Sequence, residues 1–380
     1  MANNQAFKIK NGLSATRYLG TNGTETAGSE GYNLSSASYD SVSFSILSQD
    51  TTAVGLAIKS DGTALYMHGA TNDTLYQYTL TTAWDLSTAS YASKSVSTSA
   101  VNGNAAGVFF KPDGTSFWVT GSTNDSVYQY DMTTAWDVST ASYASKSFSV
   151  ASQETVPQGL SFKSDGTKMY VLGSASDNVN QYSLSTAWDV STASFDSVTF
   201  SVNSQTAGPV SLFFNSDGTS FFVCGNNSVF KYNLSTSWDV STASYTGDSY
   251  DISPQSTASY DAVFSSDGSK MYVIGITNDT IYQYSTVAYT QTLDLSTGHT
   301  FSFTPSGATT VSFTNPPASG LAVGFAVEII GDGSAITWPS SVKWHLATAP
   351  TATATKEVYT FITTDGGTTY YGKKAGENVV

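Results

Sequence analysis

Carboxylates and histidines are the side chains in this sequence that could carry acid–base or metal chemistry. A repeated stretch places Asp261 at a position where its other four copies have Gly55, Gly107, Gly159 and Ser211. Hydrolysis of a glycosidic bond requires a pair of carboxyl groups, and no second carboxylate aligns with Asp261. The three histidines are scattered along the chain, without the spacing of metal ligands. We therefore expect no catalytic residue, no metal site and no cofactor.

Glutamine recurs at a spacing that could serve ligand binding. Twelve residues before an Asp-Gly pair, four of the five copies of the repeat carry Gln. Amide side chains suit sugar hydroxyls, but they equally suit the backbone of neighbouring loops, and recurrence favours this second role. The residues beside the glutamines differ from copy to copy, which recognition of an asymmetric ligand requires. The candidate ligand-binding residues are Gln49, Asp50, Asn102, Gln153, Glu154, Gln205, Gln255, Tyr260 and Asp261.

Trp-Asp pairs recur in four equivalent loops and admit two interpretations. The tryptophans could stack on sugar rings beside carboxylates, or they could lock the loops, with Trp packed between repeats and Asp bonded to backbone amides. Identical copies favour the lock, so we expect any ligand on the face with the glutamine loops. Cys224, the one cysteine, is interpreted as a buried, unreactive thiol. The pairs are Trp84-Asp85, Trp136-Asp137, Trp188-Asp189 and Trp238-Asp239.

The repeat itself must position these residues. The Asp of its Asp-Gly pair recurs at intervals of 52, 52, 52 and 50 residues. Each copy holds four strand-like runs: a short apolar run, a β-branched and aromatic run after the Asp-Gly turn, an alternating run, and a fourth run after the Trp-Asp loop. Four antiparallel strands per copy predict an all-β, five-bladed β-propeller. The marker residues are Asp61, Asp113, Asp165, Asp217 and Asp267.

The two ends of the array predict how the ring closes. Residues 34–46 match only the last part of the repeat, so the array opens on a fourth strand. It stops at residues 282–284, after a third strand with no fourth strand behind it. We expect the N-terminal strand to complete the last blade, because this pairing removes two exposed sheet edges.

Three regions follow from these limits. Residues 1–33 are polar and rich in Gly, Thr and Asn, which predicts a docking peptide or linker without a core of its own. Residues 34–285 form the propeller. In residues 286–380 the period stops, and short strands with Gly and Pro turns predict a C-terminal β-sandwich, with a hairpin across residues 365–367.

The composition of the chain restricts the classes of partner that it could bind. The chain of 380 residues is 40% hydrophobic and only 12% charged, with a formal net charge of −14. Ser, Thr, Gly, Asn and Tyr therefore dominate the surface, as is typical of extracellular or virion β proteins. The negative charge disfavours nucleic acid and anionic membranes as partners. No apolar run approaches the length of a membrane span, so we expect no membrane insertion.

Several segments resemble structural proteins of tailed bacteriophages, particularly marine and cyanophage-like ones. The N-terminal stretch MANNQAFKIKNGLSATRYLGTNG is similar to the N-termini of tail-fibre and minor structural proteins. SDGTKMYV and LSTAWDVSTA resemble propeller repeats of phage and bacterial surface proteins. Residues 336–344 and the stretch TTDGGTTYYGKKAG are similar to a C-terminal module of phage fibres. The resemblance implies attachment to other virion proteins through the N-terminal segment and a homo-oligomer, with a trimer favoured.

We therefore expect a non-enzymatic virion protein. It would be a fibre or appendage on the surface of a phage particle, on the tail or the capsid, that presents β domains to a host-surface glycan or protein. The alternative is a capsid decoration or tail-scaffold protein without a receptor role. A glycan-degrading propeller enzyme is less favoured, because a carboxylate pair is missing from the predicted channel.

Overall fold

The computed structural model of the protein describes residues 31–101, 103–287, 289–305, 309–331 and 335–377. It also describes three short N-terminal strands, β1 (Phe7–Lys8), β2 (Ser14–Ala15) and β3 (Glu25–Ala27). The chain divides into two compact units. One unit contains Gly31–Ser35 and Val42–Thr286, and the other contains Ser36–Ser41 and the chain from Val287 onward.

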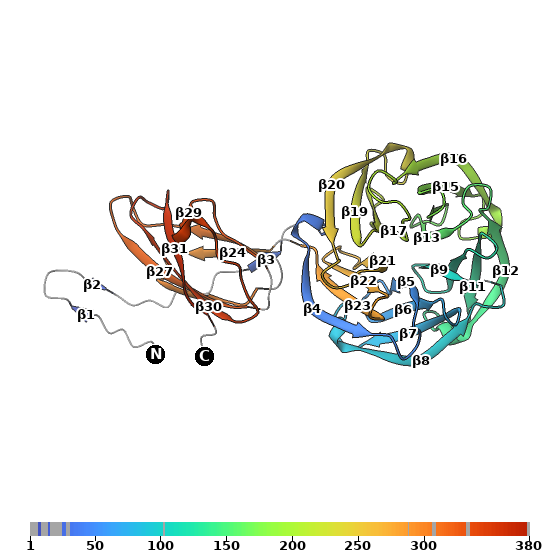
Figure 1. Ribbon diagram of the computed structural model, residues 1–380, viewed down its shortest axis with the longest axis horizontal. Coiled ribbons are helices and arrows are strands. Elements are labelled where there is room, and N and C mark those ends of the chain that lie inside the picture. Colours follow the sequence, from blue (N-terminus) through green and yellow to red (C-terminus); the bar gives the residue numbers. More distant parts are fainter. Residues whose placement is uncertain are drawn as a thin grey trace. The chain divides into compact units, whose positions relative to one another are not determined.

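The first unit is a five-bladed β-propeller, in which five sheets of four strands form a ring (Figure 1). Blade 1 comprises β5 (Ala53–Ile58), β6 (Ala64–Gly69), β7 (Thr74–Leu80) and β8 (Ala89–Ser97). Blade 2 comprises β9 (Ala105–Phe110), β10 (Ser116–Gly121), β11 (Ser126–Met132) and β12 (Ala141–Ser149). Blade 3 comprises β13 (Pro157–Phe162), β14 (Lys168–Gly173), β15 (Asn178–Leu184) and β16 (Ala193–Ser201). Blade 4 comprises β17 (Ser211–Phe214), β18 (Ser220–Gly225), β19 (Ser228–Leu234) and β20 (Ala243–Asp251). The fifth sheet has the order β21 (Ser259–Phe264), β22 (Lys270–Gly275), β23 (Thr280–Ser285) and β4 (Ser38–Ser45).

The apolar side chains of the blades pack between neighbouring blades rather than within one blade. One cluster joins Tyr66 and Leu75 of blade 1 to Phe117 and Val119 of blade 2. Other clusters join blades 2 and 3, blades 3 and 4, and blade 1 with the fifth sheet. Because each blade completes its core with the next one, a single blade has no core of its own.

The Asp-Gly turns follow from local chemistry. In blade 3, Gly166 has a φ of +73°, a conformation that glycine adopts without steric cost. The carboxylate of Asp165 accepts a hydrogen bond from the backbone N–H of Thr167 at 2.9 Å. The same carboxylate lies 2.7 Å from the ammonium of Lys163. Blades 1 and 2 repeat this arrangement, so the turn residues serve the fold.

The Trp-Asp loops are structural locks, as their recurrence predicts. The backbone N–H of Trp84 donates to the carbonyl of Gly62 at 3.0 Å, and a side chain on Gly62 would overlap the indole ring. Asp85 caps the short 3-10 helix η2 (Leu86–Thr88) by accepting from the N–H of Ser87 at 3.0 Å. The loops of the next three blades repeat this geometry around η3 (Val138–Thr140), η4 (Val190–Thr192) and η5 (Val240–Thr242).

Hydrogen bonds between blades tie these loops to their neighbours. A tyrosine on the second strand of one blade donates its hydroxyl to the backbone carbonyl of the Trp of the next blade. The bond from Tyr272 to Trp84 joins the fifth sheet to blade 1. Gln283 also joins them, since its side-chain carbonyl accepts from the N–H of Leu86 at 2.8 Å. The tyrosine pairs are Tyr66 with Trp136 (2.9 Å), Tyr170 with Trp238 (2.6 Å) and Tyr272 with Trp84 (2.6 Å).

His68 is buried between blades 1 and 2, and we expect its burial to make the stability of the propeller depend on pH. Its side chain is fully buried, with Nδ1 3.2 Å from the carbonyl oxygen of Ala106 and Nε2 3.0 Å from the hydroxyl of Thr98. Burial lowers the pKa of His68 from 6.5 to about 4. His68 thus binds a proton less readily in the folded state than in the unfolded chain. The contribution of neutral His68 to the unfolding free energy is therefore complete above pH 6.5 and is lost as the pH falls through about 4.

A repeat-matched variant isolates this effect. Blade 2 has Thr120 at the equivalent position, and its hydroxyl donates to the next blade at the carbonyl of Gln158, 2.9 Å away. Relative to His68→Thr, the native chain should lose about 3 kcal/mol of unfolding free energy between pH 6.5 and 4. Urea unfolding of both proteins across this pH range measures the difference, in which the other titrating groups cancel. Parallel curves would contradict the assignment.

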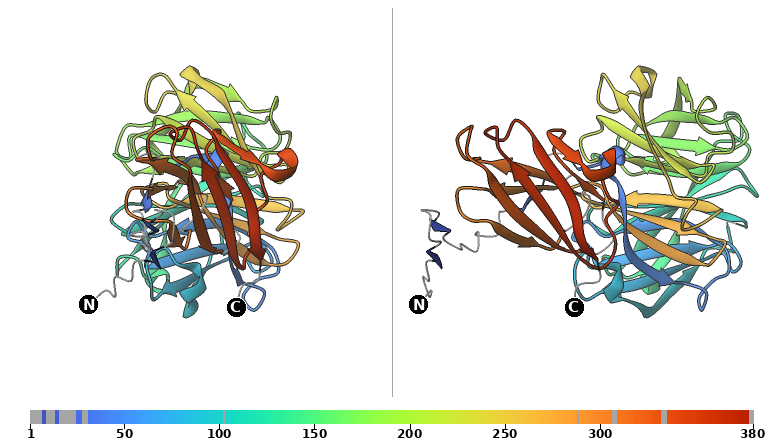
Figure 2. Two further views of the ribbon diagram at one scale, coloured as in Figure 1. Left: turned by 90° about the vertical axis from the view of Figure 1, so that its left-hand side faces the viewer. Right: turned by 60° about the vertical axis from the view of Figure 1, so that its left-hand side comes forward.

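The second unit contains two β-sheets that share one hydrophobic core. Figure 2 shows its strands, coloured brown to red, from two further sides. One sheet has the order β28-β26-β24-β3 and the other the order β25-β27-β30-β31-β29. The core includes Phe301, Phe325, Val327, Tyr359 and Phe361. The strands are β24 (Tyr289–Asp294), β25 (Thr300–Phe303), β26 (Thr309–Thr314), β27 (Val323–Ile330), β28 (Ile336–Thr337), β29 (Val342–Trp344), β30 (Lys356–Thr363) and β31 (Tyr370–Glu377).

The pairing in this unit is partly parallel. The pairs β24–β26, β25–β27, β26–β28 and β29–β31 are parallel, whereas β30 and β31 form the expected antiparallel hairpin. Asp365 accepts from the N–H of Thr369 at 2.9 Å in the hairpin turn, and Gly366 and Gly367 both have positive φ. Within the described residues, no helix is long and apolar enough to span a membrane.

Candidate functional site

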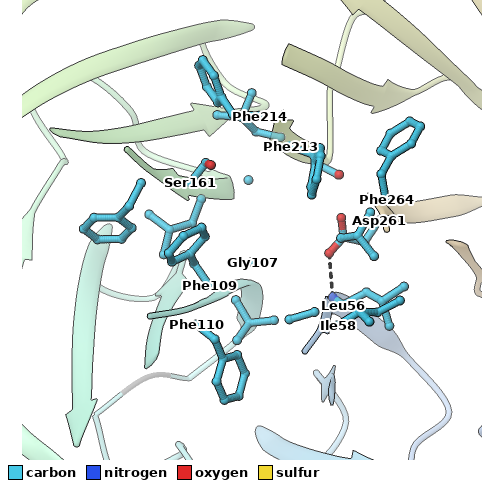
Figure 3. Close-up of a pocket in the computed structure, with 18 of the residues that line it drawn as sticks. Leu56, Ile58, Gly107, Phe109, Phe110, Ser161, Phe213, Phe214, Asp261 and Phe264 are labelled. Atoms are coloured by element: carbon cyan, nitrogen blue, oxygen red, sulfur yellow. Dashed lines mark hydrogen bonds between the residues drawn. The ribbon is translucent and has the colours of Figure 1, made fainter. Parts of the chain in front are cut away.

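The central channel of the propeller contains a cavity of about 270 Å³ (Figure 3). The first strand of each blade contributes to its wall, because these strands are the innermost of each sheet. Serines of the Asp-Gly turns, Ser60, Ser164 and Ser216, and the Trp-Asp residues Trp136 and Trp238 also line it. The cavity therefore lies toward the face with the Trp-Asp loops, and not toward the face with the glutamine loops.

The wall of the cavity is mostly apolar. Phe109 and Phe213 occupy equivalent positions in blades 2 and 4 and are both half-buried. The ring of Phe213 lies 5.3 Å from that of Phe264, measured between centroids. Ile58 lies on the same wall (Figure 3). These side chains leave apolar surface open in the channel, where a ligand would find hydrophobic contact.

Asp261 is the ionisable residue among the described residues that line this cavity. Its side chain is only 7% exposed. One carboxylate oxygen accepts from the N–H of Leu56 at 2.6 Å, and the other accepts from the N–H of Ala262 at 2.8 Å. Burial raises the pKa of Asp261 to about 6, against the lowering effect of these bonds and of Ser211. The bond to Leu56 also links the fifth sheet to blade 1.

Close packing explains why glycine occupies the positions equivalent to Asp261 in blades 1 to 3. A side chain on Gly55 would overlap the carbonyl of Ala106, and one on Gly107 would overlap the carbonyl of Gln158. The first strands of blades 1 to 3 thus approach too closely for a side chain at this level of the channel. In the fifth sheet this position carries Asp261, whose carboxylate bonds to the N–H of Leu56 in blade 1 and gives the cavity wall its charge.

The predicted glutamine residues mostly have partners within the fold. The side-chain oxygens of Gln49, Gln205 and Gln255 each accept from a tyrosine hydroxyl of the same blade, at 3.2–3.3 Å. Gln153 is half-buried. The equivalent hydroxyl near it, that of Tyr182, has no partner within the described part of the chain. These contacts match the loop-bonding role of the glutamines, and ligand binding by them stays a prediction.

The two acids beside the glutamines are buried. Asp50 is 2% exposed, and its carboxylate accepts from the backbone N–H groups of Thr52, Thr71 and Asn72. Glu154 is also 2% exposed and holds the equivalent loop of blade 3 through three backbone N–H groups. Both acids order the loop between the second and third strands of their blades. Their burial leaves little carboxylate surface for a ligand.

The remaining predicted residues differ in how far the structure describes them. Asn102 lies outside the described residues. Tyr260 is half-buried on β21, next to Asp261. The thiol of Cys224 is fully buried, and burial raises its pKa to about 12, which fits an unreactive thiol. Among the described residues, no group of three or more His, Cys, Asp or Glu side chains could hold a metal ion.

Tyr32 has a structural role in the propeller that the sequence reasoning missed. It has a φ of 64°, its N–H donates to the carbonyl of Gly268 at 2.7 Å, and its ring packs on that glycine. Tyr32 thus takes the place of the Trp of the other loops. The signal was present, because Tyr32 lies 52 residues before Trp84, one full repeat. The change of residue type hid it.

Comparisons with known proteins give no family for this chain. No family model and no curated protein matches it. Among solved structures, a functionally unknown protein from Desulfotomaculum acetoxidans DSM 771 matches with a TM-score of 0.40 and 14% identity, over 59% of this chain and 79% of the other. A luciferin-regenerating enzyme matches with a TM-score of 0.39 and 12% identity, over 65% and 94% of the two chains. Similarities at this level carry no conclusion about function.

Proposed function

We propose that this chain is a non-enzymatic structural protein of a tailed-bacteriophage particle, a fibre or appendage that adsorbs to a host-surface glycan. The sequence resemblance supports the phage context. The cavity supports a binding role over hydrolysis, because Asp261 has no second carboxyl group beside it within the described lining. The runner-up is a capsid decoration or tail-scaffold protein, which would bind no glycan.

An exposed aromatic and basic surface on the second unit carries the glycan part of the proposal. Tyr371 on β31 is 59% exposed, and its strand neighbours are Ile362 on β30, 45% exposed, and Lys343 on β29. Lys373 lies two residues further along β31 and is also exposed. These four residues, with Trp344 and His345, line a shallow cavity of about 530 Å³. We call this surface the Tyr371 platform.

The chemistry of the Tyr371 platform suits a sugar. An exposed aromatic ring stacks on the apolar face of a pyranose, and lysine ammonium groups donate to hydroxyl or carboxylate oxygens. Lys343 and Lys373 have no carboxylate partner within the described part of the chain, whereas the neighbouring Lys374 lies close to Glu357 and Glu377. Two unpaired cations on so acidic a chain favour a glycan that carries carboxylate groups.

A double variant tests the platform. Tyr371→Ala with Lys373→Ala should weaken glycan binding at least about ten-fold, because it removes one stacking contact and one charged donor. A glycan array and titration with the best glycan measure this loss. Tyr91→Ala is the matched control, since Tyr91 is an exposed tyrosine, 36% accessible, on the outer strand of blade 1. Undiminished binding by the double variant contradicts the platform, and release of reducing sugar would favour an enzyme.

Two features of the architecture belong to the same proposal. We infer that β4 closes the ring, which the position of β4 beside β23 in the fifth sheet supports. Ile46 adds to this support, because it is fully buried in a cluster with Tyr272 and Ile281. We also infer that the two sheets of the second unit form a β-sandwich, which their common core supports.

The attachment and the assembly state rest on the resemblance. Residues 1–33 are proposed to dock on other virion proteins, and most of them lie outside the described residues. The trimer is proposed on the same basis. The apolar run at residues 321–327 adds less support than its sequence suggests, because Phe325 and Val327 are buried within the unit itself. Light scattering of the purified chain measures the assembly state, and a monomer overturns the trimer.

A further inference from the structure

We propose that the central cavity of the propeller binds a small amphiphilic cation, with its apolar group between Phe109, Phe213 and Phe264 and its ammonium group at Asp261. This site is separate from the Tyr371 platform, and the inference does not depend on the glycan proposal. It rests on the shape of the cavity, the exposure of its aromatic wall and the surroundings of one buried carboxylate.

The carboxylate of Asp261 lacks a cationic partner. Asp261 is only 7% exposed, and its carboxylate accepts hydrogen bonds from the neutral backbone N–H groups of Leu56 and Ala262. No lysine, arginine or histidine is among the described residues that line the cavity. A buried charge without a counter-ion is costly. A bound ammonium group would offset this cost.

The charge state of Asp261 fits this role near neutral pH. Its pKa is about 6, so the carboxylate is mostly ionised at pH 7.5. Cys224 also lies near Asp261, and its thiol stays neutral because burial raises its pKa to about 12. The part of the cavity wall at Asp261 is thus negatively charged at neutral pH.

The aromatic wall supplies the apolar half of the site. Phe109 and Phe213 are half-buried, whereas Phe117 and Phe221 in the blade cores are fully buried. The rings of Phe109 and Phe162 lie 5.2 Å apart, and those of Phe213 and Phe264 lie 5.3 Å apart. Covering the exposed surface of Phe109 and Phe213 is favourable because it removes apolar area from water, whereas Phe162 and Phe264 are themselves buried. Aromatic faces also attract cations.

The size of the cavity restricts the ligand. A cavity of about 270 Å³ accommodates a small molecule, such as a single ring with a short amine chain. A neutral sugar suits the cavity less well than an amphiphile, since most of the exposed surface of its wall is apolar. An anion is disfavoured by Asp261. Small cations with one apolar group are the class of ligand that matches both the apolar wall and the carboxylate of Asp261.

Three related compounds test the proposal on the full chain. Phenethylamine, 2-phenylethanol and phenylacetate share one ring and one short chain but differ in charge. Isothermal titration at pH 7.5 should show phenethylamine binding at least ten-fold more tightly than 2-phenylethanol, with phenylacetate weakest. Equal affinity for the amine and the alcohol would overturn the role of Asp261. Absence of binding for all three would overturn the site.

Two variants locate the binding in the cavity. Asp261→Ser introduces the residue that blade 4 has at this position, Ser211, and should abolish the preference for the amine over the alcohol. Phe213→Ala should weaken both compounds by a similar factor. Asp251→Ser is the control, because Asp251 is an exposed carboxylate at the end of β20 and should leave all affinities unchanged.

The outcomes of these experiments are distinguishable from those of the glycan test. If Asp261→Ser fails to fold, the comparison of the three compounds on the native chain and on Phe213→Ala still decides the proposal. Affinities for the amine and the alcohol that both stay unchanged in Phe213→Ala would place the binding outside the cavity. Loss of glycan binding in the Tyr371 platform variant leaves the amine titration unaffected.

Discussion

A chain that begins at residue 47 is expected to melt at a temperature at least about 10 °C below that of the full chain. The deletion removes β4 from the edge of the fifth sheet and takes Ile46 out of the cluster that contains Tyr272 and Ile281. It also removes Tyr32, whose ring lies 5.7 Å from Phe222 and 5.5 Å from Phe264. Loss of one large buried side chain typically costs about 2–5 kcal/mol, so the combined loss exceeds about 5 kcal/mol.

Differential scanning calorimetry measures this effect, and a shorter deletion is its control. A chain that begins at residue 31 retains Tyr32, β4 and Ile46, so its propeller transition should stay close to that of the full chain. Any effect of losing β3 on the second unit then appears in both truncated chains. Unchanged melting of the longer deletion would show that β4 does not close the ring.

Trp84→Ala is expected to destabilise the propeller by about 2–4 kcal/mol, because the indole packs on Gly62 and adjoins the cluster between the fifth sheet and blade 1. The carbonyl of Trp84 also accepts the hydroxyl of Tyr272 at 2.6 Å, and loss of the ring loosens the loop that presents this carbonyl. Urea unfolding at pH 7 measures the change. Trp84 does not line the described cavity, so amine binding should be retained.

Trp84→Tyr is the matched variant, because the chain itself places a tyrosine in this role. Tyr32 has a φ of 64° and Trp84 a φ of 65°, and each packs on the glycine of its own Asp-Gly turn. Trp84→Tyr should therefore lose much less stability than Trp84→Ala. Equal stability of the alanine variant and the native chain would contradict the lock. A tyrosine variant of native stability that fails to bind glycan would place recognition on this face.

Much of the propeller could be predicted from the repeat. The turn at Asp165 and Gly166 and the Trp-Asp caps depend on residues that are close in sequence, so their pattern is visible without coordinates. The interpretation of the tryptophans as loop locks is confirmed by the contacts of these loops. The second unit has no internal repeat to count, and its parallel pairs, such as β24 with β26, join strands whose partners the sequence does not reveal.

Less of the candidate site than of the fold could be predicted from the sequence. The sequence marked Asp261 by its difference from four aligned residues, but not the bond to Leu56, which lies 205 positions away. It did not show that Asp50 and Glu154 are buried against backbone amides, because an acid beside a loop has the same sequence whether it faces solvent or the loop.

The sequence by itself determined the number of blades, their strands, the turns and the locks, because these follow from short-range chemistry copied five times. Only the tertiary structure decided where the ring leaves space. Phe109 and Phe213 occupy equivalent positions on separate blades, and they share a cavity only after the blades have formed the ring. Close approach of the first strands excludes side chains at Gly55, Gly107 and Gly159, whereas the fifth sheet has Asp261 at this position, bonded to Leu56 of blade 1. The physical reason is that channel contacts join residues far apart in sequence, where no local pattern records them.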